Sequence, residues 1–167
     1  MASERCNLQE RESDVRYQRE SLADSWDDIC ALGKAHWHET EAYRHAQVFN
    51  PDKARYLHFE QIGIYHQFTA RDGDVLAGYG GIYVMPSMHT QKLIASEDTY
   101  FLLPEYRKGR NAIGFLKFIE NYLKDLGCVE FSVSTKLSNP RAERIIEYLK
   151  FKFVEKRWSK HYEVAHV

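Results

Sequence analysis

A short basic segment is the part of this sequence whose residue types and spacing best suit the binding of an anion. It precedes a run in which apolar residues recur at every third or fourth position, and this spacing predicts an amphipathic helix over 112–126 with Gly127 as its C-terminal cap. A helix N-terminus offers unpaired amide N–H groups and a partial positive charge. Cationic side chains and a glycine there predict a site for a polyanion, most naturally a diphosphate; a solvated basic turn that binds nothing is the alternative. The segment comprises Arg107, Lys108, Gly109, Arg110, Asn111 and Ala112.

The elements that would position this segment follow from the residue pattern on either side of it. Pro104 cannot donate to a strand ladder, so it marks the end of the strand that leads into the basic segment. Ser25 predicts the N-cap of a first helix, and Pro51 suits the first turn of a second. The whole pattern describes a single α/β domain with a mixed sheet. We expect strands over 14–20, 62–71, 75–85, 92–103 and 129–135, helices from 25 to 36 or beyond and over 51–61, 112–126 and 141–149, and two strand-like pieces over 151–162.

Length, charge and cysteine usage limit the class of protein. The length of 167 residues predicts one domain, over 14–167, and the polar, non-periodic residues 1–13 predict a flexible tail before it. A net charge of −1 argues against a nucleic-acid partner, and the absence of an apolar run of about 18 residues argues against a membrane span. The charged N-terminus does not have the apolar core of a secretory signal, and the three cysteines are far apart. Free thiols in a reducing cytoplasm are therefore expected.

The basic segment and its flanks resemble motif A of the GNAT superfamily of acetyl-CoA-dependent N-acetyltransferases. That motif is Arg or Gln, two residues, Gly, one residue, then Gly or Ala, after a strand that ends in Pro-x-Tyr. Here Pro104-Glu105-Tyr106 leads to Arg107 at the first position and Ala112 at the last. Arg110 stands where the central glycine is expected, and this Gly-Arg pair resembles a variant often carried by phages. Whether Arg110 bonds phosphates or points outward stays open.

The resemblance extends over residues 14–162, because the expected order of strands and helices is also the GNAT order. It implies a GNAT fold, a central mixed and twisted β-sheet flanked by helices, with acetyl-CoA as co-substrate and no metal. The pantetheine arm of the cofactor would lie along the fourth strand. Strand N–H groups around Phe101, Leu102 and Leu103 would then face the thioester oxygen.

Transfer of an acetyl group to an amine requires that the amine lose a proton. A lysine-like amine with a pKa of about 10.4 is only ~1 part in 2,500 neutral at pH 7, a deficit near ~4.6 kcal/mol. Glu97 and Asp98 are the candidate bases, and Glu97 matches the acidic residue that resembling sequences carry about seven residues before the strand-ending proline. Adjacent strand residues face opposite sides, so both can enter one cleft only at a β-bulge. One or both could instead face water.

Two later residues match GNAT positions with a change of context. Tyr148 matches the tyrosine that would protonate the leaving thiolate, although Lys152 replaces the glycine of the Gly-Phe pair that follows it in the family. The alternative is a half-buried aromatic residue on an amphipathic helix. Asn139 resembles the asparagine that contacts the cofactor, and a plain N-cap or turn asparagine is the alternative.

We therefore expect an acetyltransferase that moves acetyl from acetyl-CoA to a primary amine by direct attack in a ternary complex. A catalytically degenerate GNAT-fold module that binds CoA or a protein is the alternative, motivated by Arg110 and Lys152. The partner would be a small-molecule or protein amine, and a homodimer is an open alternative to a monomer. A protein lysine, a protein N-terminus, a polyamine, an aminoglycoside or an amino acid would all suit this chemistry.

Overall fold

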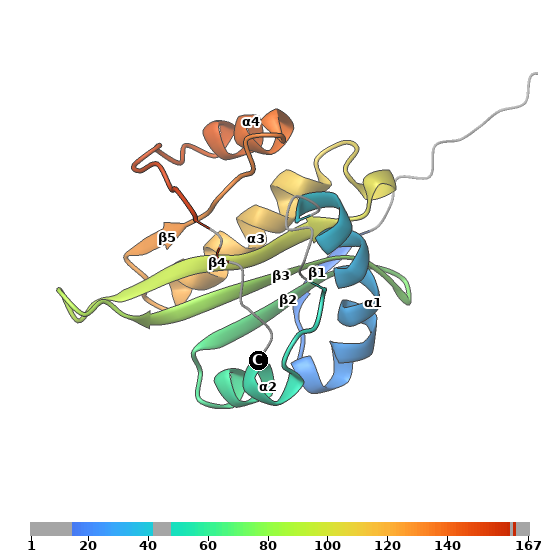
Figure 1. Cartoon of the computed structure of the whole chain (residues 1–167), viewed down its shortest axis with the longest axis horizontal. Helices are drawn as coiled ribbons and strands as arrows, with labels where there is room; N and C mark the ends of the chain where they lie inside the picture. Colours follow the sequence, from blue (N-terminus) through green and yellow to red (C-terminus); the bar gives the residue numbers. More distant parts are fainter. Residues whose placement is uncertain (1–14, 42–47, 161, 163–167) are drawn as a thin grey trace, which may run out of the picture.

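The computed structural model describes residues 15–41, 48–160 and 162, and it forms an α/β fold around one sheet (Figure 1). The strand order is β1-β2-β3-β4-β5; the first four strands are antiparallel neighbours, and β5 runs parallel to β4. The predicted mixed sheet is thus confirmed. The strands are β1 (Arg16–Arg19), β2 (Tyr65–Asp72), β3 (Val75–Pro86), β4 (Leu93–Leu102) and β5 (Glu130–Ser132).

Four α-helices flank the sheet. The apolar stripe of α3 packs on one face, and α1 and α2 pack on the other. A short 3₁₀ turn, η1 (Pro104–Tyr106), joins β4 to α3 and begins at the proline predicted to end the strand. The helices are α1 (Leu22–Thr40), α2 (Lys53–Gln61), α3 (Asn111–Asp125) and α4 (Pro140–Tyr148).

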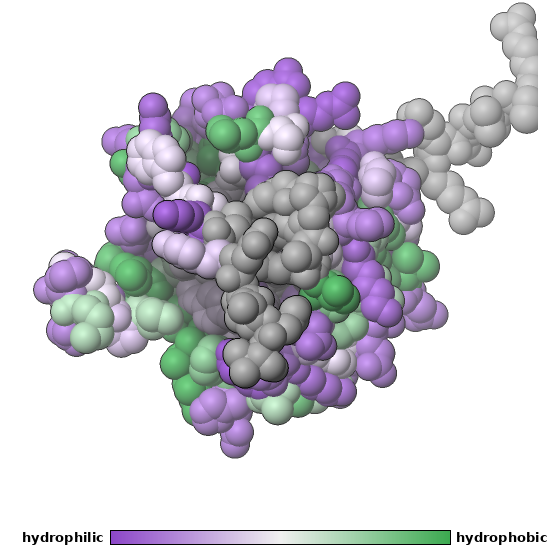
Figure 2. Space-filling view, viewed as in Figure 1, coloured by the Kyte–Doolittle hydropathy of each residue, from purple (hydrophilic) through white to green (hydrophobic). Residues whose placement is uncertain are grey.

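The core has one part on each face of the sheet. On the α3 face, Phe115, Ile119 and Leu123 are fully buried because they recur at helical spacing toward the strands. On the opposite face, α1 buries Leu22 and Leu32 against tyrosine and phenylalanine side chains of β2, β3 and β4. Hydrophilic side chains prevail at the rim of the face seen in Figure 2, with hydrophobic ones in smaller groups. Among the described helices, none has a stretch that is both apolar and long enough to span a bilayer.

Three helices end in the same hydrogen-bonded motif, in which a residue of positive φ follows the last turn. After α3, Gly127 has φ 92°, its N–H donates to the Lys124 C=O, and the Cys128 N–H donates to the Leu123 C=O. This confirms the predicted cap. After α4, the equivalent residue is Lys150, with φ 68°, a conformation that costs a residue with a side chain more than it costs glycine.

Two predicted helix starts are wrong by a few residues. The N-cap of α1 is Ser21, whose Oγ accepts from the Ala23 N–H, whereas Ser25 lies inside the helix and is fully buried. Both serines suit a cap by type; the carboxylate of Glu60 also accepts from the Leu22 N–H and fixes the earlier start. The N-cap of α2 is Asp52, so Pro51 precedes the helix.

The expected pair of C-terminal strands is also wrong within the described residues. Residues 151–160 contain no strand, and most of their side chains are exposed. Strands need a neighbouring edge of sufficient length, and β5 is only three residues long. Alternation in this segment was therefore not enough to produce pairing. The expected tail over 1–13 lies outside the described residues.

Candidate active site

A β-bulge in β4 separates the two candidate carboxylates. Thr99 pairs with Gly81 and Glu97 pairs with Ile82, so Asp98 is an extra residue with no partner opposite it on β3. An inserted residue bends its strand and re-aims the side chain. A bulge that could bring both adjacent acids into one cleft is thus present, but their side chains have different partners.

Asp98 faces α2 and β2. Its Oδ2 accepts hydrogen bonds from the hydroxyl groups of Tyr56 at 3.0 Å and Tyr65 at 3.4 Å. Burial raises the pKa of Asp98 above its ordinary value, and the two tyrosine hydrogen bonds offset only part of that effect. Burial, and after it the Asp98 charge, in turn raises the pKa of Tyr79 and of Tyr83. The carboxylate thus lies among four tyrosines.

Tyr65 reaches Asp98 because Gly81 has no side chain. A Cβ at Gly81 would lie 1.7 Å from the Tyr65 hydroxyl oxygen, which is far inside van der Waals contact. A side chain there would displace the phenol from the carboxylate. Gly81 therefore belongs to the architecture of the site, although it bears no reactive group.

Glu97 has a different set of partners. Its Oε2 accepts from the backbone N–H of Ser134 at 3.2 Å and from the Ser134 hydroxyl at 3.1 Å, in the segment that follows β5. Burial raises the pKa of Glu97, and the bonds from Ser134 counter that shift. The bulge thus directs the Asp98 carboxylate to the tyrosines and the Glu97 carboxylate to the segment after β5.

The outer edge of β4 is open beyond its pairing with β5. In the described chain, β5 pairs only with Ile94, Ala95 and Ser96. The Leu103 N–H donates to the Ala77 C=O at 2.8 Å, and hydrogen-bonded pairs alternate in an antiparallel ladder, so the backbone of Leu102 faces away from β3. Of the three predicted strand amides, at Phe101, Leu102 and Leu103, the Leu102 N–H is therefore directed toward the open edge.

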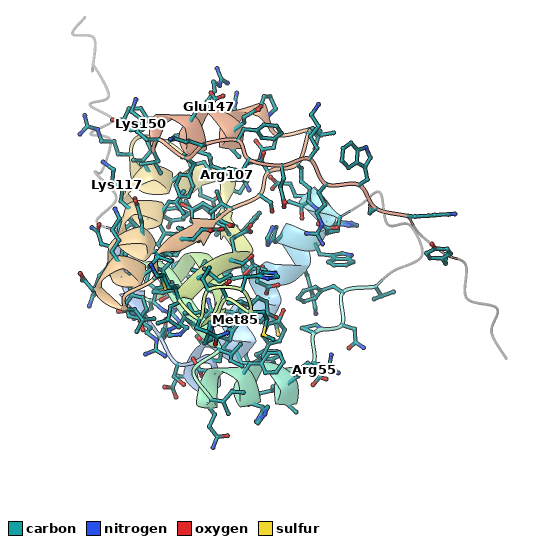
Figure 3. All side chains as sticks on the ribbon, turned by 90° about the vertical axis from the view of Figure 1, so that its left-hand side faces the viewer. Arg55, Met85, Arg107, Lys117, Glu147 and Lys150 are labelled. Atoms are coloured by element: carbon teal, nitrogen blue, oxygen red, sulfur yellow. The ribbon has the colours of Figure 1, made fainter. Side chains whose placement is uncertain are left out.

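Arg107 joins this edge to α1. Its Nε donates to the Leu102 C=O at 2.7 Å, and its two terminal nitrogens donate to the carboxylate of Glu39 at 2.8 and 2.7 Å. Its guanidinium carbon also lies 5.0 Å from the centre of the Phe101 ring. Figure 3 labels Arg107 among the side chains that surround this junction. The guanidinium predicted for phosphate contact is thus held by protein groups.

The rest of the basic segment has a fixed backbone and exposed cationic side chains. The Tyr17 hydroxyl donates to the Asn111 C=O at 3.1 Å, and the Tyr100 hydroxyl donates to the Ala112 C=O at 2.5 Å. Lys108 and Arg110 are exposed. Gly109 has φ 64°, with no atom within 4 Å of the place a Cβ would take. The first turn of α3 therefore presents its amides beside two cations in contact with solvent.

The two predicted residues on α4 lie apart from the carboxylates' hydrogen-bond network. The Asn139 Oδ1 accepts from the Ala142 N–H at 3.2 Å, so the N-cap alternative describes its role in the fold. Tyr148 is 63% exposed, so it is not the half-buried aromatic that the alternative expected. Its phenol is open to solvent at the last turn of α4.

His36 and Gln67 also lie at the site; the sequence indicated His36 only as a structural or substrate-cleft histidine and did not indicate Gln67. His36 stacks on Phe101 with ring centres 4.7 Å apart, and its Nδ1 lies 2.8 Å from the Tyr79 hydroxyl. Burial lowers the pKa of His36 to about 4, so the ring is neutral at pH 7. Its spacing from Ile29 and Leu32, on the apolar stripe of α1, was the signal that could have found it. Gln67 is a buried amide in the middle of β2 and has no such signal.

A cavity of about 50 Å³ lies between α1, α2 and the sheet, next to the tyrosines that contact Asp98. Its wall is mostly apolar and aromatic, and it includes the amide of Gln67 and the hydroxyl of Thr99. No cluster of three or more His, Cys, Asp or Glu that could hold a metal ion exists among the described residues. The lining residues are Leu22, Trp26, Ile29, Cys30, Phe49, Pro51, Tyr56, Tyr65, Gln67, Tyr79 and Thr99.

Comparison with protein families gives one match that covers most of the fold. The family model described as Acetyltransferase (GNAT) family matches residues 26–151. That range begins in α1 and ends just after α4, so it includes the bulge, the open edge of β4 and the basic segment. Comparison with curated proteins found no match.

Solved structures with a similar fold include several acetyltransferases. An aminoglycoside acetyltransferase from an uncultured soil metagenomic sample, in complex with sisomicin, is 12% identical over 90% of this chain and 97% of its own, with a TM-score of 0.71. A ribosomal-protein-alanine N-acetyltransferase from Brucella melitensis biovar Abortus 2308 is 13% identical over 89% and 99%, with a TM-score of 0.68. AAC(6')-Iy, in complex with the bisubstrate analogue CoA-S-monomethyl-acetylneamine, is 16% identical over 91% and 100%, with a TM-score of 0.68. At these identities the likeness shows the fold.

Proposed function

Because the chain belongs to the GNAT acetyltransferase family, we propose that it moves an acetyl group from acetyl-CoA to a primary amine by direct attack in a ternary complex. The observation that carries this proposal is the open edge of β4 beside the Asp98 bulge. It offers a backbone N–H for the thioester and a carboxylate for the amine within a few residues of one strand.

The Leu102 amide is the proposed donor to the thioester oxygen. As the amine nitrogen bonds to the carbonyl carbon, negative charge develops on that oxygen, and a fixed N–H there is typically worth about 3–4 kcal/mol. Arg107 supports this role because it occupies the Leu102 C=O and ties the strand end to α1. The strand end is thereby held in one position before the ligand arrives.

Asp98 is the proposed base. Its contacts with Tyr56 and Tyr65 put it on the side of the sheet that carries the cavity, and its raised pKa makes it a stronger base than an exposed carboxylate. It would take the proton that the amine must lose. Glu97 is the second candidate, and its hydrogen bonds to Ser134 favour a role in holding the segment after β5.

Collapse of the tetrahedral intermediate breaks the carbon–sulfur bond and leaves the thiolate of CoA. Tyr148 is the proposed proton donor to that thiolate, because its phenol O–H can act as a general acid. Its exposure leaves the hydroxyl free to meet a ligand. The nitrogen loses a second proton as the amide forms, and this proton restores the Tyr148 phenol, so the products are the amide, the free thiol and the protonated base.

The diphosphate of the cofactor is proposed to bind the first turn of α3. Backbone amides of that turn, with Lys108, Gly109 and Arg110, supply N–H groups and positive charge. Arg107 would contribute mainly by positioning, since Glu39 holds it. Asn139 remains a proposed cofactor contact beside its capping role.

A CoA-binding module without turnover is the second candidate function. The observation in its favour is that Tyr148 is exposed on α4 and is not among the hydrogen-bond partners of either carboxylate in the described part of the chain. Such a module would bind acetyl-CoA but release no thiol when amines are added. The acceptors named for the structural neighbours, an aminoglycoside and a ribosomal-protein alanine, are candidate acceptor classes to include.

The experiment that tests the proposal combines binding and turnover. Purified protein is titrated with acetyl-CoA by calorimetry, and thiol release is then followed with primary amines, with the acetylated product identified by mass spectrometry. We expect binding together with amine-dependent thiol release. Binding without release from any amine would favour the module, and no binding at millimolar acetyl-CoA would reject both functions.

A further inference from the structure

One buried oxygen in the cavity wall has no hydrogen-bond donor. Gln67 is 1% exposed, and its Nε2 donates to the Phe68 C=O at 2.8 Å and to the Gly80 C=O at 3.1 Å. These two bonds fix the orientation of the amide, because a flip would set its oxygen against two carbonyl oxygens. Among the described residues, no group donates to the Gln67 Oε1.

Such an atom is costly unless a ligand satisfies it. A buried acceptor that has left water without gaining a partner carries its full desolvation penalty. The Thr99 Oγ1, also in the cavity wall, is buried near the Tyr65 hydroxyl. The Gln67 oxygen can be satisfied only by an N–H or O–H donor, and the Thr99 oxygen has lone pairs that can accept from the same donor.

The rest of the wall favours a cation. Side chains of Trp26, Phe49, Tyr56, Tyr65 and Tyr79 line the cavity, and the faces of aromatic rings attract ammonium groups. In a wall without aromatic rings or oxygen acceptors, the free-energy cost of desolvating an ammonium group would be too large for it to bind.

A buried negative charge stands behind this wall without a cationic partner. Tyr56 and Tyr65 line the cavity and donate their hydroxyls to Asp98. The ion pairs among the described residues leave Asp98 out, so its charge is met only by neutral hydroxyls. A cation bound in the cavity would supply the missing opposite charge.

We propose that this cavity selects the acceptor, which is a slender aliphatic primary amine whose ammonium group donates to the Gln67 Oε1 and the Thr99 Oγ1 within the ring of aromatic side chains. The inference rests on the proposed function and names its substrate class. Thr99 directly follows Asp98 in β4, so the bound nitrogen lies close to the proposed base. A lysine side chain and a free linear diamine share this chemistry.

The size of the cavity argues against the bulky acceptors. A volume of about 50 Å³ admits the end of an unbranched aliphatic amine, whereas an aminoglycoside ring carries several polar groups that an aromatic wall would leave unpaired. The sisomicin bound by a structural neighbour is thus a discriminating probe.

The test uses the full-length chain with acetyl-CoA and four amines: 1-aminopentane, 1,5-diaminopentane, an Nα-blocked lysine peptide and sisomicin. We expect kcat/KM for the linear amines to exceed that for sisomicin by at least about tenfold. The diamine and the peptide distinguish a free amine from a protein lysine. Acetylation of sisomicin at equal or higher kcat/KM would overturn the substrate class and leave the acetyltransferase function intact.

Two variants locate the binding site. Thr99→Val keeps the shape of the side chain and removes the hydroxyl, and Gln67→Leu removes the unpaired oxygen. Each should raise the KM for 1-aminopentane about tenfold and leave the Kd for acetyl-CoA unchanged. The amine-free unfolding temperature of Thr99→Val should change little, because valine keeps the volume of the side chain. A fall in that temperature with an unchanged KM would assign Thr99 a structural role and reject the site.

A binding measurement without turnover keeps the inference testable if the reaction is slow. 1-Aminopentane should raise the unfolding temperature of the wild-type chain more than its N,N,N-trimethyl derivative does, because the latter has no N–H donor. Equal shifts, or equal shifts in wild type and Thr99→Val, would reject the ammonium site. Failure of acetyl-CoA itself to bind would instead reject the function on which the inference rests.

Discussion

Asp98 and Glu97 show how one backbone irregularity gives two identical functional groups different surroundings. In a regular strand, the two side chains would point to opposite faces of the sheet, and both residues would pair with β3 in the same way. The bulge gives Asp98 two phenol donors and leaves Glu97 with the backbone and hydroxyl of Ser134. Chemistry at this site therefore depends on strand geometry as much as on residue type.

The first prediction concerns these two acids. Asp98→Asn keeps an oxygen that can accept from the tyrosines but cannot take a proton, so kcat should fall at least about 10²-fold. Glu97→Gln should lower kcat less than about tenfold. Thiol release under saturating acetyl-CoA measures both, and calorimetry verifies that the Kd for acetyl-CoA is unchanged. A larger loss in the glutamine variant would make Glu97 the base.

The pH profile of kcat/KM tests the same assignment, because a base and an acid change activity with pH in opposite directions. A base must be deprotonated, so activity should rise with pH through the raised pKa of Asp98, above the ordinary range of an aspartate. This acidic limb should disappear in Asp98→Asn. An identical limb in the variant would mean that another group controls it.

A second prediction concerns His36 and the stability of the free protein. Its pKa is about 4 in the fold against an ordinary value of 6.5, so the unfolded chain binds more protons between these values. The free energy of unfolding should therefore fall by up to about 3 kcal/mol as the pH drops from 6.5 to 4. Urea denaturation of wild type and His36→Phe over this range should show a shallower fall in the variant. Equal slopes would exclude His36 as the cause.

At the scale of residues, the sequence was informative where the signal was local. The acidic pair and the basic segment follow from residue type and position, and the structure brings the acids to a bulge as required. Gln67 could not be predicted, because a glutamine between His66 and Phe68 has no local mark of an unsatisfied oxygen. Its significance arises only when α1, α2 and three strands enclose it.

At the scale of elements, the turn from β4 into α3 combines a fixed backbone with exposed positive charge. Arg107 is anchored to Glu39, whereas Lys108 and Arg110 extend from the first turn into solvent. The proposed diphosphate site therefore has a rigid part made of amides and an adaptable part made of two side chains.

The third prediction follows from this division. The double variant Lys108→Gln/Arg110→Gln should weaken the binding of CoA by at least about tenfold, because charge-assisted hydrogen bonds to phosphate are lost. Glu39→Gln is the matched control, since it frees Arg107 without removing a cation and should leave the affinity equal or higher. Calorimetric titration with CoA measures both. An unchanged affinity in the double variant would remove the diphosphate from this turn.

The fourth prediction compares two helix ends of the same geometry. Lys150 and Gly127 both have positive φ after a helix, at 68° and 92° (Figure 3 labels Lys150). Lys150→Gly should stabilise the protein by about 0.5–1 kcal/mol, and Gly127→Ala should destabilise it by about 1 kcal/mol. Urea denaturation measures both, with Lys150→Ala as a control that should give no gain. A loss of stability on Lys150→Gly would show that its side chain has another role.

Elements were predicted well where a cap and a periodic stripe agreed. The α3 helix has both, and its start and end were predicted to within one residue. The start of α1 was misplaced because Ser21 and Ser25 have equal capping ability, and the choice depends on Glu60 of α2. The C-terminal strands were misjudged because alternation describes a strand's faces but does not supply the edge it must join.

At the scale of the whole molecule, binding and folding should be linked. The cofactor is proposed to contact β4, α3 and α4, so it would hold together elements from much of the chain. Acetyl-CoA at 100 times its Kd should stabilise the folded state by about 2.7 kcal/mol, which raises the unfolding temperature by about 5–10 °C for a domain of this size. Differential scanning fluorimetry measures the shift, with adenosine as a weaker control ligand. No shift at any concentration up to millimolar would contradict the proposal.

The open edge of β4 has a further consequence for the free protein. A strand edge with unpaired backbone groups is a template for any extended chain that meets it, and native proteins normally cover such edges. Beyond Ser96, the described part of this chain provides no strand to do so. Concentrated protein without coenzyme A should therefore aggregate sooner than protein with coenzyme A bound. Light scattering with and without coenzyme A measures the difference, and slower aggregation with the ligand would show that it also keeps the protein dispersed.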